Sequence, residues 1–272
     1  SVIMITGRTF DRFSPLRMLS WICHRYGFGT YLHFIKGMLN RENIRESRKI
    51  VGRLIEGIEE TDSAIYVDTI ISPSMASALA QSLQVPGVSG MENNTILFEF
   101  SNHDSQEVME EVLRGCILAS APGMNRLILR HGDHFFGNRK TIHLWLTWHD
   151  YRNANLMILL AYILLGHPDW KGAEISIKAA FPYNEVAERT ARLNQMISEG
   201  RLPIAPKNLQ IIPTDDRVDF DAMVEHRSSS ADLVILGFTE ERLKEKGAGL
   251  LRRHPSLQDV LFVSAEETIF IE

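Results

Sequence analysis

Four consecutive apolar residues, Leu233-Val234-Ile235-Leu236, decide the fold class of this chain. A strand with one face in water alternates apolar and polar residues, whereas a strand covered on both faces reads as an unbroken apolar run. Similar short runs recur along the chain, and longer amphipathic stretches separate them. The sequence therefore predicts an α/β fold with mainly parallel sheets and helices on both faces, which makes three layers.

The stretches between the runs have the spacing and the end signals of helices. In residues 41–60, apolar side chains recur three and four positions apart. Ser14 and Ser72 precede two other stretches as helix caps, and Asp150 or Asn153 precedes a third. We expect strands at 2–6, 29–35, 64–71, 95–100, 125–130, 141–147, 174–180, 209–213, 231–237 and 260–263, with a return strand at 268–271. We expect helices at 15–26, 41–60, 73–83, 105–121, 153–165, 184–199, 220–226 and 240–253.

The pattern of strands and helices occurs twice. About five strands fall on each side of a polar, glycine-bearing stretch at residues 131–140. Little residue identity links the two halves, so the repeat is one of architecture. The sequence predicts two tandem α/β subdomains, residues 1–135 and 136–272.

The charge and composition of the chain exclude some classes of binding partner. The chain has 272 residues and a formal net charge of −5, and its basic residues are scattered among acids. Such a chain has no general attraction for nucleic acid, so we expect no nucleic-acid partner. No apolar run reaches the roughly 18 residues that span a bilayer. Cys23 and Cys116 lie in separate apolar segments, which is typical of buried thiols in a reducing compartment.

The beginning of the sequence suggests that the chain was excised from a larger protein. Residues 2–6, Val-Ile-Met-Ile-Thr, already read as a buried strand. Neither a start methionine nor the few loose residues that usually open a natural chain precede them. We therefore expect a domain cut at its edge.

Motifs of catalysis are absent from the sequence. There is no G-x-S-x-G elbow and no H-E-x-x-H helix, and Ser89 precedes a strand rather than following one. Two histidine pairs have spacings that metal ligands can have, but sequence places no third ligand beside either pair. We predict no catalytic residue and no metal site. The histidines concerned are His131 with His134, near Asp133, and His143 with His149, before Asp150.

Ligands of parallel α/β sheets bind at the carboxyl ends of the strands. Neither a Walker loop nor a G-x-G-x-x-G loop follows a strand here. The layout of the second half resembles that of universal stress proteins, which bind ATP through a glycine-rich loop after the equivalent strand. In this chain the loop reads Gly237-Phe238-Thr239-Glu240-Glu241, and its two carboxylates would repel phosphate. We expect a nucleotide-binding fold that lacks the usual phosphate-binding loop, and no cofactor. Nucleotide sensing is the alternative function.

Three segments resemble the cytosolic C-terminal domain of the cation–chloride cotransporters. Residues 87–98 are similar to a family segment with the pattern G-x-G-x-x-x-P-N-T: Asn94-Thr95 match its Asn-Thr, and Asn93 replaces its proline. Residues 142–170 contain a Trp-bearing strand, a His-Asp pair, a leucine-rich helix and a trailing Trp170. Residues 229–271 contain two apolar strands like the last two of the family, with Phe238 where the family has proline.

The resemblance implies a function for the larger protein. It would be an electroneutral secondary transporter that couples chloride to sodium and/or potassium, with its ion path in membrane helices outside this chain. The chain would be a regulatory and dimerisation domain at the cytosolic face of the cell membrane, with a second copy and the membrane domain of the same transporter as partners. The long insert of animal members, between Asn208 and Phe220, is missing, which suggests a prokaryotic relative. An enzyme that uses His143, His149 and Asp150 is the third alternative.

Overall fold

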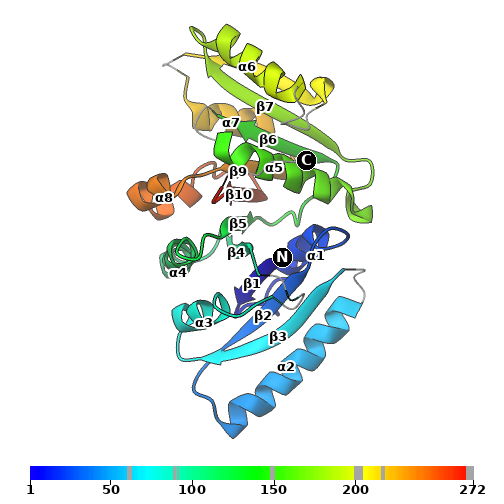
Figure 1. Ribbon diagram of the computed structural model, residues 1–272, viewed down its shortest axis with the longest axis vertical. Helices are drawn as coiled ribbons and strands as arrows, with labels where there is room; N and C mark the ends of the chain where they lie inside the picture. The colour runs from blue at the N-terminus through cyan, green and yellow to red at the C-terminus, as the bar shows by residue number, and fades with distance from the viewer. Residues whose placement is uncertain are drawn as a thin grey trace. The chain divides into compact units, whose positions relative to one another are not determined.

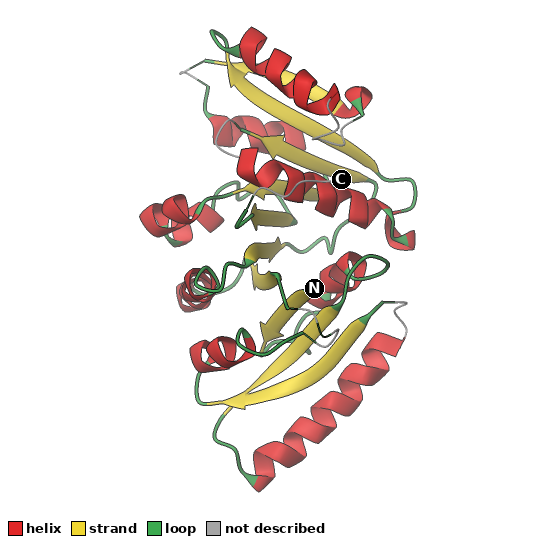
Figure 2. Ribbon diagram, viewed as in Figure 1, coloured by secondary structure: helices red, strands yellow, loops and turns green. Residues whose placement is uncertain are grey.

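The chain folds into two compact units, Ser1–Leu129 and Arg130–Glu272. The computed structural model describes residues 1–59, 63–87, 90, 92–147, 151–198, 205–215 and 218–267. Each unit has its own strands and helices (Figure 1, Figure 2). The predicted boundary between α/β subdomains at residues 135 and 136 stays a prediction.

The first unit has strands in the order β3-β2-β1-β4-β5. β1 pairs in parallel with β2 and β4, and β2 pairs in parallel with β3. All five residues of β1 are buried, as an unbroken apolar run requires. The elements are β1 (Val2–Thr6), α1 (Ser14–Ile22), β2 (Gly29–Lys36), α2 (Arg41–Glu59), β3 (Ile65–Ser72), α3 (Met75–Ser82), β4 (Thr95–Ser101), α4 (Gln106–Leu118) and β5 (Asn125–His131), whose last two residues belong to the second unit.

The second unit repeats this topology. Its strands follow the order β10-β9-β6-β7-β8, and each pairs in parallel with its neighbour in this order. Both units thus place their first strand in the middle, so the predicted fold class is confirmed. The elements are β6 (Thr141–Leu146), α5 (Tyr151–Leu165), η2 (Pro168–Trp170), β7 (Glu174–Pro182), α6 (Val186–Ser198), η3 (Pro206–Asn208), β8 (Leu209–Thr214), α7 (Phe220–Ser228), β9 (Leu233–Gly237), α8 (Glu240–Lys246), α9 (Ala248–Leu251) and β10 (Val260–Ser264).

Helices cover both faces of the strands within each unit. Right-handed crossovers that step along the sheet in one direction put their helices on one face, and crossovers that step in the opposite direction put theirs on the other. In the first unit, α1 and α2 accordingly lie on one side of the strands and α3 and α4 on the other (Figure 1). Among the described residues, no helix is both long and apolar enough to cross a membrane.

The helix ends correct several expectations. Ser14 is the first residue of α1 rather than its cap, and Ser74 rather than Ser72 caps α3, through a 3.1 Å hydrogen bond from the N–H of Ser77. Asn153 lies inside α5 and does not cap it. The helix predicted at 240–253 is interrupted at Gly247, whose φ of 53° and ψ of −139° are compatible with glycine but not with a helix. The proposed cap Asp150 and the return strand at 268–271 lie outside the described residues.

The stretch at 131–140 has a defined conformation. Phe135, Phe136 and Arg139 have positive φ, as does Gly137, where a Cβ would collide with the carboxylate of Asp232. Phe136 is fully buried and packs edge-on against Trp170, with the ring centroids 6.5 Å apart. Buried packing of this kind compensates for the strain of positive φ at a phenylalanine.

Two buried or half-buried carboxylates hold this stretch by its backbone. Asp259 accepts hydrogen bonds from the N–H groups of Gly132 and Phe136, at 3.2 and 2.8 Å. Burial raises the pKa of Asp259 to about 6, although these two hydrogen bonds favour the charged form. Asp232 accepts from the N–H groups of residues 138, 140 and 141, at 3.0, 2.7 and 2.9 Å, and from the hydroxyl of Thr141.

Replacing Asp232 should loosen the 131–140 stretch. We expect Asp232→Ala to lower the free energy of unfolding of the second unit by about 2 kcal/mol, because three backbone donors lose a charged acceptor but remain partly hydrated. Asp232→Asn, which keeps one acceptor oxygen, should cost about half as much. Urea denaturation measures both losses, and equal stability of all three proteins would contradict this role.

Candidate functional site

The strand order places one switch point in each unit. The connections reverse direction between β1 and β4 in the first unit and between β6 and β9 in the second. Open parallel sheets bind ligands in the crevice at the carboxyl ends of the two strands at such a point. The residues that follow β1, β4, β6 and β9 are therefore the first place to look for a site.

In the second unit, the loop after β9 directs its backbone into the protein. The N–H of Phe238 donates to the carbonyl of Val263 at 2.9 Å, and the carbonyl of Phe238 accepts from the side chain of Asn153 at 2.9 Å. Asn153 also accepts from the N–H of Ala265 at 2.8 Å. Phe238 is 2% exposed, so an aromatic ring fills space that a glycine-rich loop would leave open. The residue after β9 thus packs into the protein, and its backbone N–H and carbonyl are already hydrogen-bonded within the chain.

Glu240 and Glu241 form the first turn of α8, directly after Thr239. The hydroxyl of Thr239 caps the helix by accepting from the N–H of Arg242 at 3.3 Å. Glu240 pairs with Lys244 at 2.5 Å. A hydrogen bond from its own N–H and a second from Thr239 lower the pKa of Glu241. Acidic residues stabilise a helix at its N-terminus, so these two have a structural role.

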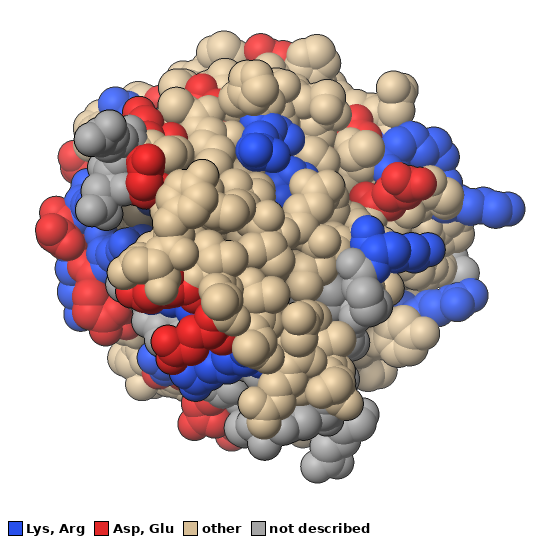
Figure 3. Space-filling view, turned by 90° about the horizontal axis from the view of Figure 1, so that it is seen from above, with Lys and Arg blue, Asp and Glu red and all other residues tan. Residues whose placement is uncertain are grey.

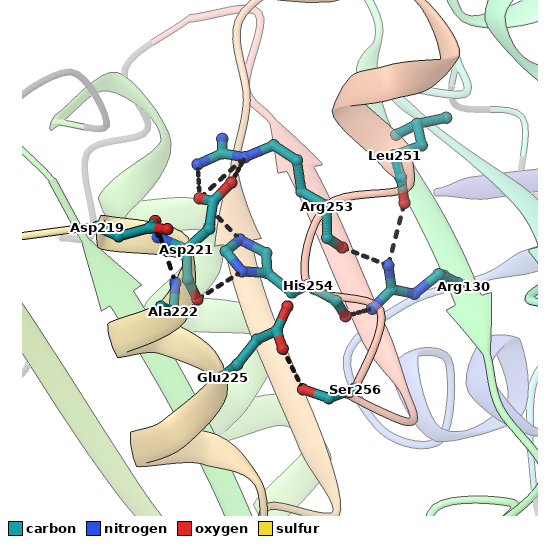
Figure 4. A network of polar contacts seen from close by, with 9 residues as sticks. All are labelled: Arg130, Asp219, Asp221, Ala222, Glu225, Leu251, Arg253, His254 and Ser256. Carbon is teal, nitrogen blue, oxygen red and sulfur yellow. Dashed lines mark hydrogen bonds and ion pairs between the residues drawn. The ribbon is translucent and has the colours of Figure 1, made fainter.

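A small pocket of about 260 Å³ opens beside this switch point. Trp145 and Phe220 line it from β6 and α7, with their rings edge to face and 5.7 Å apart. Arg253 and His254 contribute its polar wall, and Asp221 holds both of them (Figure 4). Arg253 donates to both carboxylate oxygens of Asp221, with Nε 2.9 Å from Oδ2, and His254 Nε2 lies 3.7 Å from Oδ1. Burial lowers the pKa of His254 despite the neighbouring carboxylate.

Arg130 fixes the backbone that carries Arg253 and His254 (Figure 4). Its side chain is almost fully buried, and its two Nη atoms donate to four carbonyl oxygens. Burial lowers the pKa of Arg130 to about 10, which leaves the guanidinium charged at neutral pH. The acceptors are the carbonyls of Leu251, Arg253, His254 and Leu257, at 3.1, 2.6, 2.7 and 3.3 Å.

In the first unit, paired side chains occupy the switch point. Arg12 lies 3.2 Å from Glu99 and 2.8 Å from Asp104, and Arg8 lies 2.8 Å from the other oxygen of Asp104. Thr6 donates to Glu99 at 3.1 Å, and the N–H of Ser101 donates to Asp104 at 2.8 Å. Burial alone would raise the pKa of Asp104, but the Ser101 hydrogen bond and the two arginines hold it below its usual value.

A cavity of about 580 Å³ lies beside these pairs, between the strands and helices α3 and α4. Its floor is apolar, and charged residues stand at its rim. Sequence reasoning missed it. The available signal was the run of small residues in α3, Met75-Ala-Ser-Ala-Leu-Ala-Gln-Ser82, which cannot fill the space above a sheet.

The histidines whose spacing metal ligands can have lie in other surroundings. His131 is buried, whereas His134 is exposed. His143 lies 3.0 Å from the hydroxyl of Ser228, which also accepts from the indole of Trp145 at 2.9 Å. Burial and the nearby Lys178 lower the pKa of His143 to about 4. His149 and Asp150 fall outside the described residues, as does Ser89.

Within the described ranges, no three His, Cys, Asp or Glu side chains are arranged to hold a metal ion. Cys23 and Cys116 are free and buried, as predicted, and burial raises the pKa of Cys23 to about 12. Such a thiol is protonated and unreactive at neutral pH.

Acidic and basic side chains are interspersed on the face shown in Figure 3.

Comparison with known proteins identifies the fold. No protein-family model matches the chain. No curated protein matches it significantly. Among solved structures, the chain is similar to the cytoplasmic domain of a prokaryotic cation chloride cotransporter, with a TM-score of 0.66 and 17% identity over 98% of this chain and 95% of that one.

Universal stress proteins are similar as well. One from Archaeoglobus fulgidus has a TM-score of 0.59 and 10% identity, over 98% of this chain and 96% of its own. A putative universal stress protein from Pseudomonas aeruginosa has a TM-score of 0.51 and 13% identity, over 96% and 92%. The resemblance predicted from the sequence is confirmed at the level of the fold: the chain is an α/β protein with the fold of the cytoplasmic domain of a prokaryotic cation chloride cotransporter, which it shares with universal stress proteins.

Proposed function

We propose that the chain is the cytosolic regulatory and dimerisation domain of an electroneutral secondary transporter that moves chloride together with sodium and/or potassium. The observation that carries the proposal is the match to a cotransporter cytoplasmic domain along nearly the full length of both chains. The two switch points support it, since their polar groups bind one another and leave no catalytic set among the described residues. We infer that the domain is not an enzyme.

The proposal implies membrane helices elsewhere in the same protein. We expect the gene to encode about a dozen membrane spans upstream of Ser1, and the whole protein to lie in the cell membrane with this domain on the cytosolic side. Chloride-dependent uptake of a potassium or sodium tracer into vesicles that contain the whole protein is the decisive measurement. A gene whose start codon falls at Ser1 would contradict the proposal.

Dimerisation can be tested on the chain itself. We expect sedimentation or light scattering to show a monomer–dimer equilibrium that shifts to dimer at high concentration. Leu39 and Tyr183 are exposed apolar residues in different units, 77% and 67% exposed. Leu39→Glu and Tyr183→Glu therefore probe two surfaces with matched changes, and loss of the dimer in one variant locates its interface. A monomer at the highest attainable concentration would count against this part of the proposal.

Nucleotide sensing is the second candidate, and the similarity to universal stress proteins favours it. The arrangement after β9 opposes it, because Phe238 and Asn153 use the backbone groups of the loop. Calorimetry with ATP and AMP separates the two candidates. We expect no heat of binding at millimolar nucleotide, and saturable binding would favour the sensing function.

A further inference from the structure

We propose that the cavity of the first unit is a binding site for a small amphiphilic carboxylate, with an apolar body on the order of ten carbon atoms. The cavity has about 580 Å³, which lies in the size range of sites for small organic ligands. It stands at the carboxyl ends of β1, β2 and β4, where parallel sheets bind ligands. Every residue that lines it belongs to the first unit.

The body of the ligand would lie on an apolar floor. Ile5, Phe34 and Phe98 project from three neighbouring strands toward α3 and α4. Leu79 of α3 and Val112 of α4 close the sides. Burying an apolar body against such a floor supplies most of the affinity, at about 25 cal/mol for each Å² removed from water.

The hollow exists because the residues above the floor are small. Ala76 lines the mouth from the first turn of α3, and Gly115 lines the wall from α4. A Cβ at Gly115 would lie 2.7 Å from the Phe98 ring and 3.2 Å from Leu79. Glycine therefore allows α4 to approach the ring of Phe98 closely, which shapes one end of the cavity without filling it.

The charges at the rim favour an anionic head. Three cations line the cavity: Arg8, Lys36 and Arg114. Arg8 follows β1 and Lys36 is the last residue of β2, and these strands pair directly, so Arg8 and Lys36 lie at the same edge of the cavity. Arg8 uses one nitrogen on Asp104, and its side chain remains 33% exposed. A guanidinium has five donors, so further donors can face a ligand. Two acids line the cavity: Glu99 is already paired with Arg12 and Thr6, and Glu111 lies on α4.

A carboxylate fits this rim better than a polyphosphate does. Asp104 already accepts from the N–H of Ser101 and pairs with both Arg8 and Arg12 in the turn after β4. A phosphate would need free hydrogen-bond donors in that turn, and the carboxylate of Asp104 would repel it. Asp104 does not line the cavity, so a single charge between Arg8 and Lys36 meets less repulsion than a polyphosphate that extends into the turn. The inference rests on the first unit alone, so it stands or falls independently of the transporter proposal.

Titration calorimetry with sodium decanoate, below its micelle concentration, tests the site on the intact chain. We expect saturable binding with one site per chain. Decyltrimethylammonium has an alkyl tail one carbon longer and the opposite charge, and it should bind about tenfold more weakly or not at all. Equal binding of the two amphiphiles would overturn the proposal, because it would reveal unspecific adsorption, and so would the absence of any binding of decanoate.

Three variants assign the binding to this cavity. Lys36→Gln changes an exposed side chain at the rim and should weaken decanoate binding about fivefold. Ala76→Phe, at an exposed position of the mouth, should abolish it. Lys49→Gln removes the same charge from exposed α2, on the other side of the strands, and should leave binding unchanged. Unaltered binding in both Lys36→Gln and Ala76→Phe would mean that decanoate binds at another site. Displacement of decanoate by AMP would mean that the cavity is a site for nucleotides instead.

Discussion

Arg130→Met is expected to lower the free energy of unfolding of the second unit by about 4 kcal/mol. Arg130 is 1% exposed, and its guanidinium donates to four carbonyl oxygens at distances between 2.6 and 3.3 Å. Methionine replaces only the inner part of the arginine side chain and has no donor, so these carbonyls would stay buried without partners. Part of the loss is offset, because the variant no longer buries a charge.

The loss should be confined to the end of the second unit. Hydrogen exchange should speed up most at residues 248–257 and in β10, and least in the first unit, which Arg130 does not stabilise directly. Arg130→Lys should also destabilise, because an ammonium group cannot reach four acceptors that a planar guanidinium spans. Arg114→Met is the matched control: its side chain is 66% exposed, with Glu110 at 3.8 Å, and the change should cost less than about 0.5 kcal/mol. A loss below 1 kcal/mol in Arg130→Met would contradict the structural role of this arginine.

The strands of both units were predictable to within two residues because each is a local pattern. Residues 2–6 and 260–263 are unbroken apolar runs, and the structure buries both strands completely. Periodicity also located the helices, but their ends were less accurate. Gly247-x-Gly249 was visible in the sequence, yet only the backbone angles of Gly247 show that it divides one predicted helix into α8 and α9.

The polar anchors could not be predicted, since their partners are distant in the chain. Arg130 reads as the end of an apolar strand, and its acceptors lie more than 120 positions away. Asp232 reads as a polar residue before β9, and it holds backbone groups about 90 positions earlier. Sequence spacing carries no information about such pairs. The same limit explains the missed cavity, because its apolar floor and its small-residue wall come from different elements.

Lys178→Met should stabilise the second unit by about 2 kcal/mol at pH 7. Lys178 lies in β7 with 4% of its surface exposed, and it donates to the hydroxyl of Ser176 at 2.8 Å. Burial, followed by the charge of Arg227, lowers its pKa from 10.5 to about 8. A difference of this size corresponds to a penalty of about 3 kcal/mol while the amine is charged. Loss of the Ser176 hydrogen bond returns about 1 kcal/mol of that gain.

The pH dependence distinguishes this cause from better packing alone. The pKa of Lys178 is lower in the folded state than in the unfolded state, so the penalty is complete below pH 8 and disappears as the pH rises through about 10.5. Urea denaturation should therefore show that the difference in free energy of unfolding between Lys178→Met and the unchanged protein shrinks as the pH rises from 8 to 10.5. A constant difference across this range would mean that the charge of Lys178 costs nothing.

A second readout follows from the neighbour of Lys178. Burial and the charge of Lys178 together lower the pKa of His143 to about 4. In Lys178→Met the charge is gone and the burial remains, so NMR titration should show the pKa of His143 raised but still below its usual 6.5. Lys49→Met removes an exposed lysine and should change neither the stability nor this titration. The buried charge of Lys178 thus lowers the stability of the second unit, and an apolar side chain in its place would remove that cost.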